Sequence, residues 1–166
     1  MTSDHGGVIG LAGLTAIAVI ALDQITKILA RNATSAGGVD VVGGWIRIVD
    51  VRNSGVAFGQ LSGAGFLVAL LVAIALGALG WYFLHHLGTP LIWVPTGLVF
   101  GGAVGNIVDR VRAGAVTDFI KLPHWPAFNL ADAAITVGVV VLLILVELDA
   151  RRQRKMEAGD AARDNS

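Results

Sequence analysis

Asp118 lies in VTDFI and Asp132 in FNLADAAI, and both aspartates stand directly beside apolar residues. Asp132 precedes residues 133–146, fourteen positions without a charge. A carboxylate next to hydrocarbon is costly unless it is paired or used in chemistry. Trp125-Pro126 favours a bend between the two, and carboxylates brought close together share a proton because they cannot both ionise easily. One ionised and one protonated carboxyl group can activate water and polarise a carbonyl, as in aspartic proteases.

A structural role is the alternative for each aspartate. Asn129 followed by Asp132 has the spacing of a helix capping box, and an acid in the first helical turn gains from the helix dipole. Asp118 has no such role in its local sequence, where Lys121 is the only nearby cation. We therefore expect the shared proton to rest on Asp118, because desolvation favours the neutral form, and Asp132 to activate the water.

Other polar residues are candidates for supporting roles. Asp23 and Lys27 have the i,i+4 spacing of a helical ion pair, so a purely structural role stays open. Asn53 begins NSGVAFG, whose glycines can equally be turn residues. A further set has helical spacing and fits either a structural polar cluster or direct chemistry: Asn106, Asp109 and Arg110.

The composition indicates whether these residues are surrounded by water or by lipid. The 166 residues suit one domain, 55% of them are hydrophobic and only 14% are charged, whereas soluble domains average about a quarter charged residues. This is a membrane composition. A formal net charge of zero gives no basic excess for nucleic acid, and the absence of cysteine excludes disulfides and thiolate chemistry.

Apolar runs predict an all-α polytopic membrane protein with four transmembrane helices, at about residues 8–29, 66–84, 91–108 and 129–149. Glycines at four-residue spacing in the third run, Gly97, Gly101 and Gly105, favour close helix packing. Four spans place both termini on one side of the membrane and the polar candidates together on the other. The Val-, Ile- and Trp-rich residues 39–59 predict a hairpin or small sheet on that other side.

Orientation is not settled by charge. The tail holds five Lys or Arg residues in RRQRK, 151–155, and favours cytoplasmic termini, but seven others lie on the opposite face. We expect one membrane domain over residues 1–155 and a disordered cytoplasmic tail over 156–166, where the sequence is polar and small.

Four segments in this order, ALDQITK, RNSGVAFG, GGAVGNIVDRVRAGAVTDFI and FNLADAAI, resemble the bacterial lipoprotein signal peptidases, or signal peptidase II. The resemblance implies an intramembrane aspartyl endopeptidase of the cell membrane. Such enzymes remove signal peptides from prolipoproteins, cutting just before a cysteine that carries diacylglycerol. The resemblance also implies cytoplasmic termini, an active site near the outer leaflet and an extracytoplasmic sheet over residues 39–59. Its catalytic pair falls on Asp118 and Asp132, and its supporting positions fall on Asp23, Lys27, Asn53, Asn106, Asp109, Arg110 and Asn129.

The alternative is a small membrane transporter or proton channel, because intramembrane acids often mark ion pathways. A relay needs ionisable groups at intermediate depth, whereas the runs at 66–84 and 91–108 contain no Asp, Glu, Lys or Arg. The four histidines are scattered along the chain, so we expect no metal or other cofactor. The expected partners are diacylglyceryl prolipoproteins and membrane lipid, with no nucleic acid and no obligate protein partner.

Overall fold

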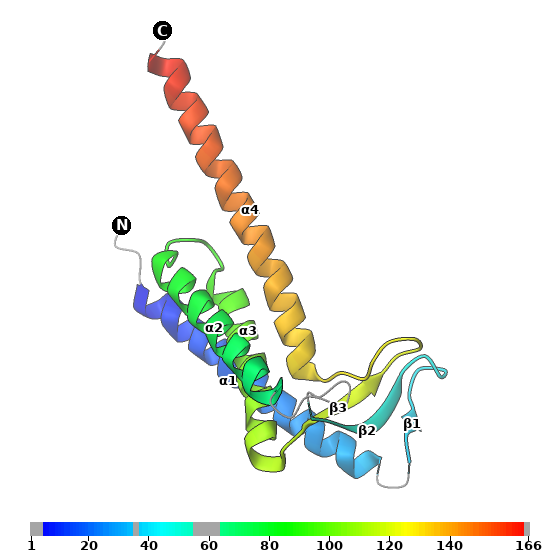
Figure 1. The fold of residues 1–166 in the computed structure, drawn as a ribbon. Helices are drawn as coiled ribbons and strands as arrows, with labels where there is room; N and C mark the ends of the chain where they lie inside the picture. Colours follow the sequence, from blue (N-terminus) through cyan, green and yellow to red (C-terminus); the bar gives the residue numbers. More distant parts are fainter. Residues whose placement is uncertain (1–4, 35–36, 55–63, 165–166) are drawn as a thin grey trace.

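The computed structural model describes residues 5–34, 37–54 and 64–164. Four helices and three strands follow one another along the chain: α1 (His5–Ala33), β1 (Val39–Asp40), β2 (Arg47–Asn53), α2 (Ala64–His85), α3 (Trp93–Ala113), β3 (Val116–Lys121) and α4 (Leu130–Asp164). Each of the four predicted helices is present as a helix. Figure 1 shows the start of α1 and the far end of α4 on the side away from the sheet.

Two helices in the described part of the chain are long and apolar enough to cross a membrane: His5–Ala33 and Leu130–Gly159. A shorter apolar helix covers Leu70–His85. Large apolar side chains on the outer faces are exposed, with Leu14 at 65% and Leu143 at 63% of full exposure. Side chains of this kind at this exposure fit a hydrocarbon surrounding better than water.

Glycines bring α1 and α3 into close contact. A Cβ on Gly97 would lie 2.5 Å from Thr15 Cβ, and one on Gly101 would lie 2.8 Å from the carbonyl oxygen of Ala16. The predicted packing role of these two glycines is therefore confirmed. Gly102, which falls outside the four-residue spacing, faces α4 instead, and a Cβ there would lie 2.5 Å from the carbonyl oxygen of Ala131.

The sheet has the order β1-β2-β3, with both pairs antiparallel. The hairpin expected within residues 39–59 is confirmed by β1 and β2, and the rest of that prediction, from residue 55, lies outside the described residues. β3 is a correction, because the predicted spans at 91–108 and 129–149 left the residues between them as a connection without a strand. Its residues Val116, Thr117, Phe119 and Ile120 favour strands, and Gly114 ends α3 in the left-handed conformation, at φ 71°. Six residues are simply too few for a periodic signal.

The C-terminal end is a second correction. Disorder was expected over residues 156–166, but α4 continues as a helix to Asp164, and residues 165–166 lie outside the described part of the chain. The tail contains Ala, Met, Glu and Arg and no proline. These residues favour helix, and extending an existing helix requires no new nucleation, so the polar composition alone does not end it.

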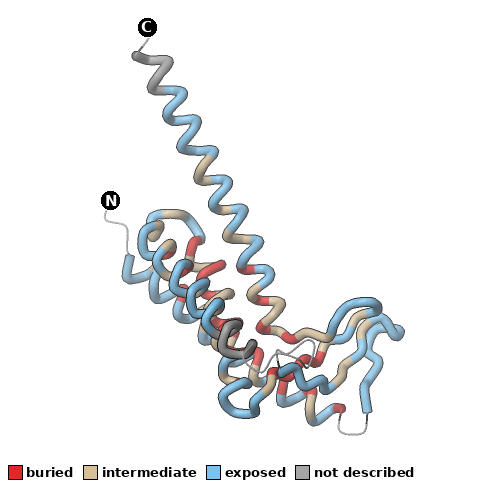
Figure 2. Tube along the Cα trace, viewed as in Figure 1, coloured by how far each residue is buried: buried red, intermediate tan, exposed pale blue. Residues whose placement is uncertain are grey.

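Buried residues gather where α1, α3, β3 and the first turns of α4 meet (Figure 2). The fully buried side chains at this junction include charged and amide groups: Asp23, Lys27 and Asn129 are all 0% exposed. Among the described residues, this deeply buried junction is rich in polar side chains, which makes it a candidate functional site.

Candidate active site

Asp118 and Asp132 come together because the chain reverses between them. Asp118 lies on β3, opposite Val51 of β2. After β3 the chain turns back, and the Phe128 carbonyl oxygen accepts hydrogen bonds from the backbone of Phe119 and Ile120, at 3.0 and 2.8 Å. The returning segment leads directly into α4, whose first turn carries Asp132.

Asn129 connects the two aspartates. Its Nδ2 donates a 2.7 Å hydrogen bond to Oδ1 of Asp118. Its Oδ1 accepts a 2.9 Å hydrogen bond from the backbone N–H of Asp132, and Oδ2 of Asp132 accepts one from the backbone N–H of Asn129 at 3.3 Å. The predicted capping box is thus confirmed, and it is compatible with a chemical role because the same Asn129 side chain also contacts Asp118.

Asp118 is buried, with 2% of its surface exposed. Besides Asn129, it is bonded by Asn53, whose Nδ2 donates to Oδ2 at 2.9 Å. Burial raises the pKa of Asp118 above its usual value, and the nearby charge of Asp132 raises it further. The two amide donors and the Lys27 ammonium oppose this change in pKa without cancelling it. The net effect shifts Asp118 toward its protonated form, with burial as the main cause.

Asp132 is only half-buried, and a residue of α3 holds its Oδ1 atom in place. Nδ2 of Asn106 donates a 2.8 Å hydrogen bond to Oδ1 of Asp132. Oδ1 of Asn106 accepts hydrogen bonds from Asn129 Nδ2 and Lys27 Nζ, both at 3.2 Å. Both carboxylates are thus held by donors from neighbouring elements, so their geometry is set before any substrate binds.

Lys27 forms the centre of a buried ionic cluster under the aspartates. Its Nζ lies 2.8 Å from Oδ2 of Asp23 and 3.0 Å from Oδ2 of Asp109. Oδ1 of Asp23 accepts a hydrogen bond from the backbone N–H of Ala131 at 3.0 Å. Oδ2 of Asp109 accepts one from the backbone N–H of Thr117 at 3.1 Å. Ala131 and Thr117 immediately precede Asp132 and Asp118 in the chain. Each acid of the cluster therefore anchors the backbone beside one of the two aspartates.

Gln24 was missed by the sequence analysis, although it stands in the quoted segment ALDQITK. Its Nε2 lies 3.0 Å from Oδ1 of Asp109, 3.2 Å from Oδ2 of Asp23 and 3.3 Å from the Gly105 carbonyl oxygen. Gln24 thus links the two acids of the cluster. An uncharged amide beside two charged residues gave no signal of its own in the sequence.

Two basic residues lie apart from the carboxylates. Arg110 is exposed, and its Nη1 donates to the backbone carbonyl of Asn106 at 3.4 Å. Lys121, the sequence-local cation of Asp118, is also exposed and donates to the carbonyl oxygen of Trp125 at 2.7 Å. The positive charge that acts on Asp118 is that of Lys27 on α1. Of the seven predicted supporting residues, six join the network around the aspartates and Arg110 stands at its edge.

The arrangement can perform acid–base chemistry on water and a carbonyl group. It joins one carboxyl group that favours its proton to a second, more exposed carboxylate through a shared amide. In the described part of the chain, no three His, Cys, Asp or Glu side chains are grouped to hold a metal ion. His85 ends α2 and His86 follows it, and their Nδ1 atoms hydrogen-bond the carbonyl oxygens of Trp81 and Tyr82.

Comparison with known proteins adds sequence and structural relatives. Residues 15–148 match the family described as signal peptidase (SPase) II. The lipoprotein signal peptidase of Syntrophomonas wolfei is 41% identical over 146 residues, covering 82% of this chain and 93% of that protein. The lipoprotein signal peptidase of Geobacter metallireducens is 42% identical over 152 residues, covering 86% and 93%. A bacterial membrane enzyme solved by the in meso method at 2.3 Å resolution superposes with a TM-score of 0.75 and 33% identity, covering 86% of this chain and 90% of that one.

Proposed function

The chain belongs to the signal peptidase II family, and from that premise we propose that it is an intramembrane aspartyl endopeptidase in which Asp118 and Asp132 are the catalytic residues. The family assignment makes it a bacterial membrane peptidase that removes signal peptides from prolipoproteins. It also leaves the alternative of a small transporter or proton channel without support. The observation that carries the aspartyl mechanism is the link from Asp118 through Asn129 to Asp132.

The proposed reaction uses one proton on the pair. Asp132 takes a proton from water as the water oxygen attacks the scissile carbonyl carbon, and Asp118 donates its proton to the carbonyl oxygen. The tetrahedral intermediate then returns that proton to Asp118 as the carbonyl re-forms. Asp132 passes the water proton to the leaving nitrogen as the peptide bond breaks. Both aspartates end in their starting protonation states, so the cycle can repeat.

Within the membrane we propose four spans, at about residues 8–29, 66–84, 91–108 and 129–149, in one domain covering residues 1–155. Cytoplasmic termini and an extracytoplasmic sheet would bring the pair close to the outer leaflet. Support comes from the two apolar helices of sufficient length and from the start of α1 and the far end of α4, which both lie away from the sheet (Figure 1). Asp23, Lys27, Asn53, Asn106, Asp109 and Asn129 would then position the pair at the membrane boundary, with Arg110 beside it.

The proposed substrates are diacylglyceryl-modified prolipoproteins, cut before the lipidated cysteine. With the pair at the membrane boundary, the acyl chains stay in hydrocarbon beside the helices while the peptide reaches the carboxylates. Each methylene kept out of water is worth about 0.8 kcal/mol, so the lipid supplies much of the binding free energy.

The test is to incubate the purified protein with a diacylated prolipoprotein and with the same precursor lacking the lipid. We expect a shortened product that begins at the lipidated cysteine, formed much faster than any product from the unlipidated precursor. Equal turnover of the two precursors would exclude the proposed role of the lipid, and no product from either would exclude the proposed activity.

A further inference from the structure

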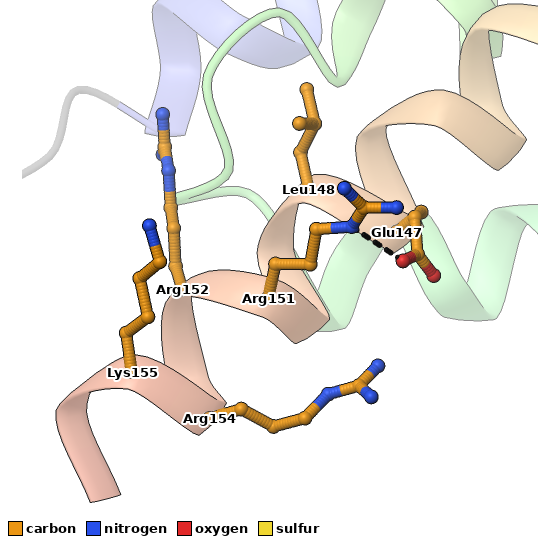
Figure 3. Close-up of a pocket in the computed structure, with 6 residues that line it drawn as sticks. All are labelled: Glu147, Leu148, Arg151, Arg152, Arg154 and Lys155. Carbon is orange, nitrogen blue, oxygen red and sulfur yellow. Dashed lines mark hydrogen bonds and ion pairs between the residues drawn. The ribbon is translucent and has the colours of Figure 1, made fainter. Parts of the chain in front are cut away.

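A cationic surface on α4 lies at the end of the molecule opposite the aspartates, and the proposed peptide cleavage does not use it. Four exposed basic side chains occupy little more than one helical turn: Arg151, Arg152, Arg154 and Lys155. With Glu147 and Leu148 they border an open hollow of about 650 Å³ (Figure 3). All six side chains belong to one helix, so this hollow is open on its other side. A ligand would be enclosed there only if a second element of the fold lies opposite α4.

Three of the four basic side chains differ in direction and partners. Arg151 turns toward Glu147 and forms an ion pair with it, at 2.6 Å. Arg152 and Lys155 extend to the same side of the helix in Figure 3, and in the described part of the chain neither forms an ion pair with a carboxylate. Leu148, Arg152 and Lys155 have the i, i+4, i+7 spacing of one helix face. Two uncompensated cations therefore stand beside an apolar side chain on that face.

The second wall is the segment that joins α2 to α3. A cavity of about 180 Å³ lies between this segment and α4, and its lining includes Arg152 and Leu148. The rest of the lining is mostly apolar: Thr89, Pro90, Leu91, Leu145 and Asp149. Asp149, the acidic member, accepts a 3.2 Å hydrogen bond from Nε2 of Gln153 on its own helix. The two hollows share Arg152 and Leu148, so a cationic surface continues into a largely apolar cleft.

We propose that this place binds one anionic phospholipid, with its phosphodiester at Arg152 and Lys155 and the glycerol end of its acyl chains against Leu148 and the apolar cleft. Guanidinium and ammonium groups are the usual donors to phosphate, and basic pockets between helices on the cytoplasmic side suit anionic headgroups. Arg151 is compensated by Glu147, and Nε of Arg154 donates to the Ala150 carbonyl oxygen of its own helix at 3.3 Å, so neither is assigned to the phosphodiester.

If the chain crosses the membrane in the four spans proposed above, the depth of Arg152 along α4 agrees with the position of a lipid headgroup. Arg152 lies twenty residues after Asp132, or about 30 Å along a helix, which equals the hydrocarbon thickness of a bilayer. It lies six residues, or about 9 Å, beyond Val146, where the apolar run ends. With Asp132 at the outer boundary, Arg152 therefore reaches the phosphates of the inner leaflet.

The experiment measures lipid binding to the full chain, purified in detergent and stripped of lipid, by native mass spectrometry. Phosphatidylglycerol and phosphatidylcholine with identical acyl chains are titrated in parallel. The test variant is Arg152→Gln/Lys155→Gln, and the matched control is Arg151→Gln/Arg154→Gln, which removes the same charge from the same turns. We expect the intact protein to prefer phosphatidylglycerol. The test variant should bind it roughly 25-fold more weakly, about fivefold for each charge, and the control within about threefold of the intact protein.

Equal losses in the two double variants would mean diffuse attraction to a charged surface and would overturn the proposal, as would equal binding of the two lipids by the intact protein. Displacement of the lipid by soluble glycerol phosphate at the same concentration would show that the apolar cleft contributes nothing. The test variant should still cleave a diacylated precursor, and Asp132→Asn should still prefer phosphatidylglycerol. These two results separate a failure of the lipid site from a failure of the proposed peptidase.

Discussion

At the residue scale, Asp118 and Asp132 carry the same functional group in unlike surroundings. Asp118 is almost fully buried, and its pKa is raised by burial and then by the charge of Asp132. Asp132 is half-buried and accepts hydrogen bonds from the backbone of Asn129 and the side chain of Asn106. These donors stabilise a carboxylate, because an ionised carboxyl group is purely an acceptor. Asp118 also accepts two amide donors, so the difference between the two aspartates lies in burial, and we propose on that ground that the resting proton is on Asp118.

Infrared spectroscopy can locate this proton. In the intact protein the carbonyl stretch of a protonated carboxyl group should persist to higher pH than for an ordinary aspartate, and Asp118→Asn should abolish that persistent band. The band should fade as pH rises through the raised pKa of Asp118. In Asp132→Asn it should fade at lower pH, because the negative neighbour that raises this pKa is gone. A band that persists in Asp118→Asn and disappears in Asp132→Asn would reverse the two roles.

Lys27 is the residue on which the buried cluster depends. Replacing it with methionine keeps an apolar stem but leaves Asp23 and Asp109 without the cation that contacts both. Removing one partner of a buried ion pair costs about 3–5 kcal/mol, so Lys27→Met should lower the unfolding midpoint strongly. The control is Lys121→Met, an exposed lysine whose loss should cost no more than about 0.5 kcal/mol. Equal midpoints for the two variants would show that the cluster does not stabilise the fold.

At the element scale, the local contacts of the site could be predicted from the sequence, whereas the contacts between distant elements could not. The capping box of Asn129 and Asp132 could be predicted because its partners are three residues apart. The contacts of Lys27 with Asp109 and of Asn53 with Asp118 join residues more than sixty positions apart, so no local pattern predicts them. The resemblance placed these residues in one site, but only the fold assigns their partners.

The contact between α3 and α4 gives an element-scale prediction. In Gly102→Ala the new Cβ would lie 2.5 Å from the Ala131 carbonyl oxygen and 2.8 Å from Ile135 Cγ1. Since Ala131 is backbone, the first turn of α4 has to move, and Asp132 moves with it. A shift of about 1 Å in a catalytic group can cost about a hundredfold in rate, and we expect a loss of that order in cleavage of a diacylated precursor.

The matched control is Gly77→Ala on α2, where nothing lies within 4 Å of the added Cβ. It should cleave at the rate of the intact protein and be at least as stable, because alanine favours helix over glycine. Equal cleavage rates for the two variants would mean that the close approach of α3 and α4 does not set the position of Asp132.

At the scale of the whole molecule, the sequence predicted the helices and the end at which the polar residues meet. It did so because hydrocarbon allows few patterns: long apolar runs and polar groups confined to their ends. The tail after Lys155 was wrongly expected to be disordered because its polarity reveals no partner, whereas helix propensity is enough to continue α4. β3, the strand that carries Asp118, was not predicted because six residues are too few to show a periodic pattern.

The proposed topology is testable because the chain has no cysteine, so single cysteines can be introduced cleanly. Gly88→Cys and Arg154→Cys lie near the proposed cytoplasmic side, and Asp40→Cys lies on β1 near the outer side; all three positions are exposed. A maleimide that does not cross membranes should label only Asp40→Cys in intact spheroplasts and should label all three after permeabilisation. Labelling of Gly88→Cys from outside would mean that the proposed orientation is reversed or that the chain does not cross the membrane four times.

The most direct test of the aspartyl mechanism is the rate of cleavage of a diacylated prolipoprotein by Asp118→Asn and by Asp132→Asn. The control is Asp40→Asn, which changes an exposed carboxylate on β1 outside the site. We predict that each site variant remains folded by thermal unfolding but loses at least about a thousandfold in rate, since an amide can neither take up nor release the shared proton. Asp40→Asn should match the intact protein. A near-normal rate in either folded site variant would contradict the catalytic role of that aspartate and, with it, the two-aspartate mechanism.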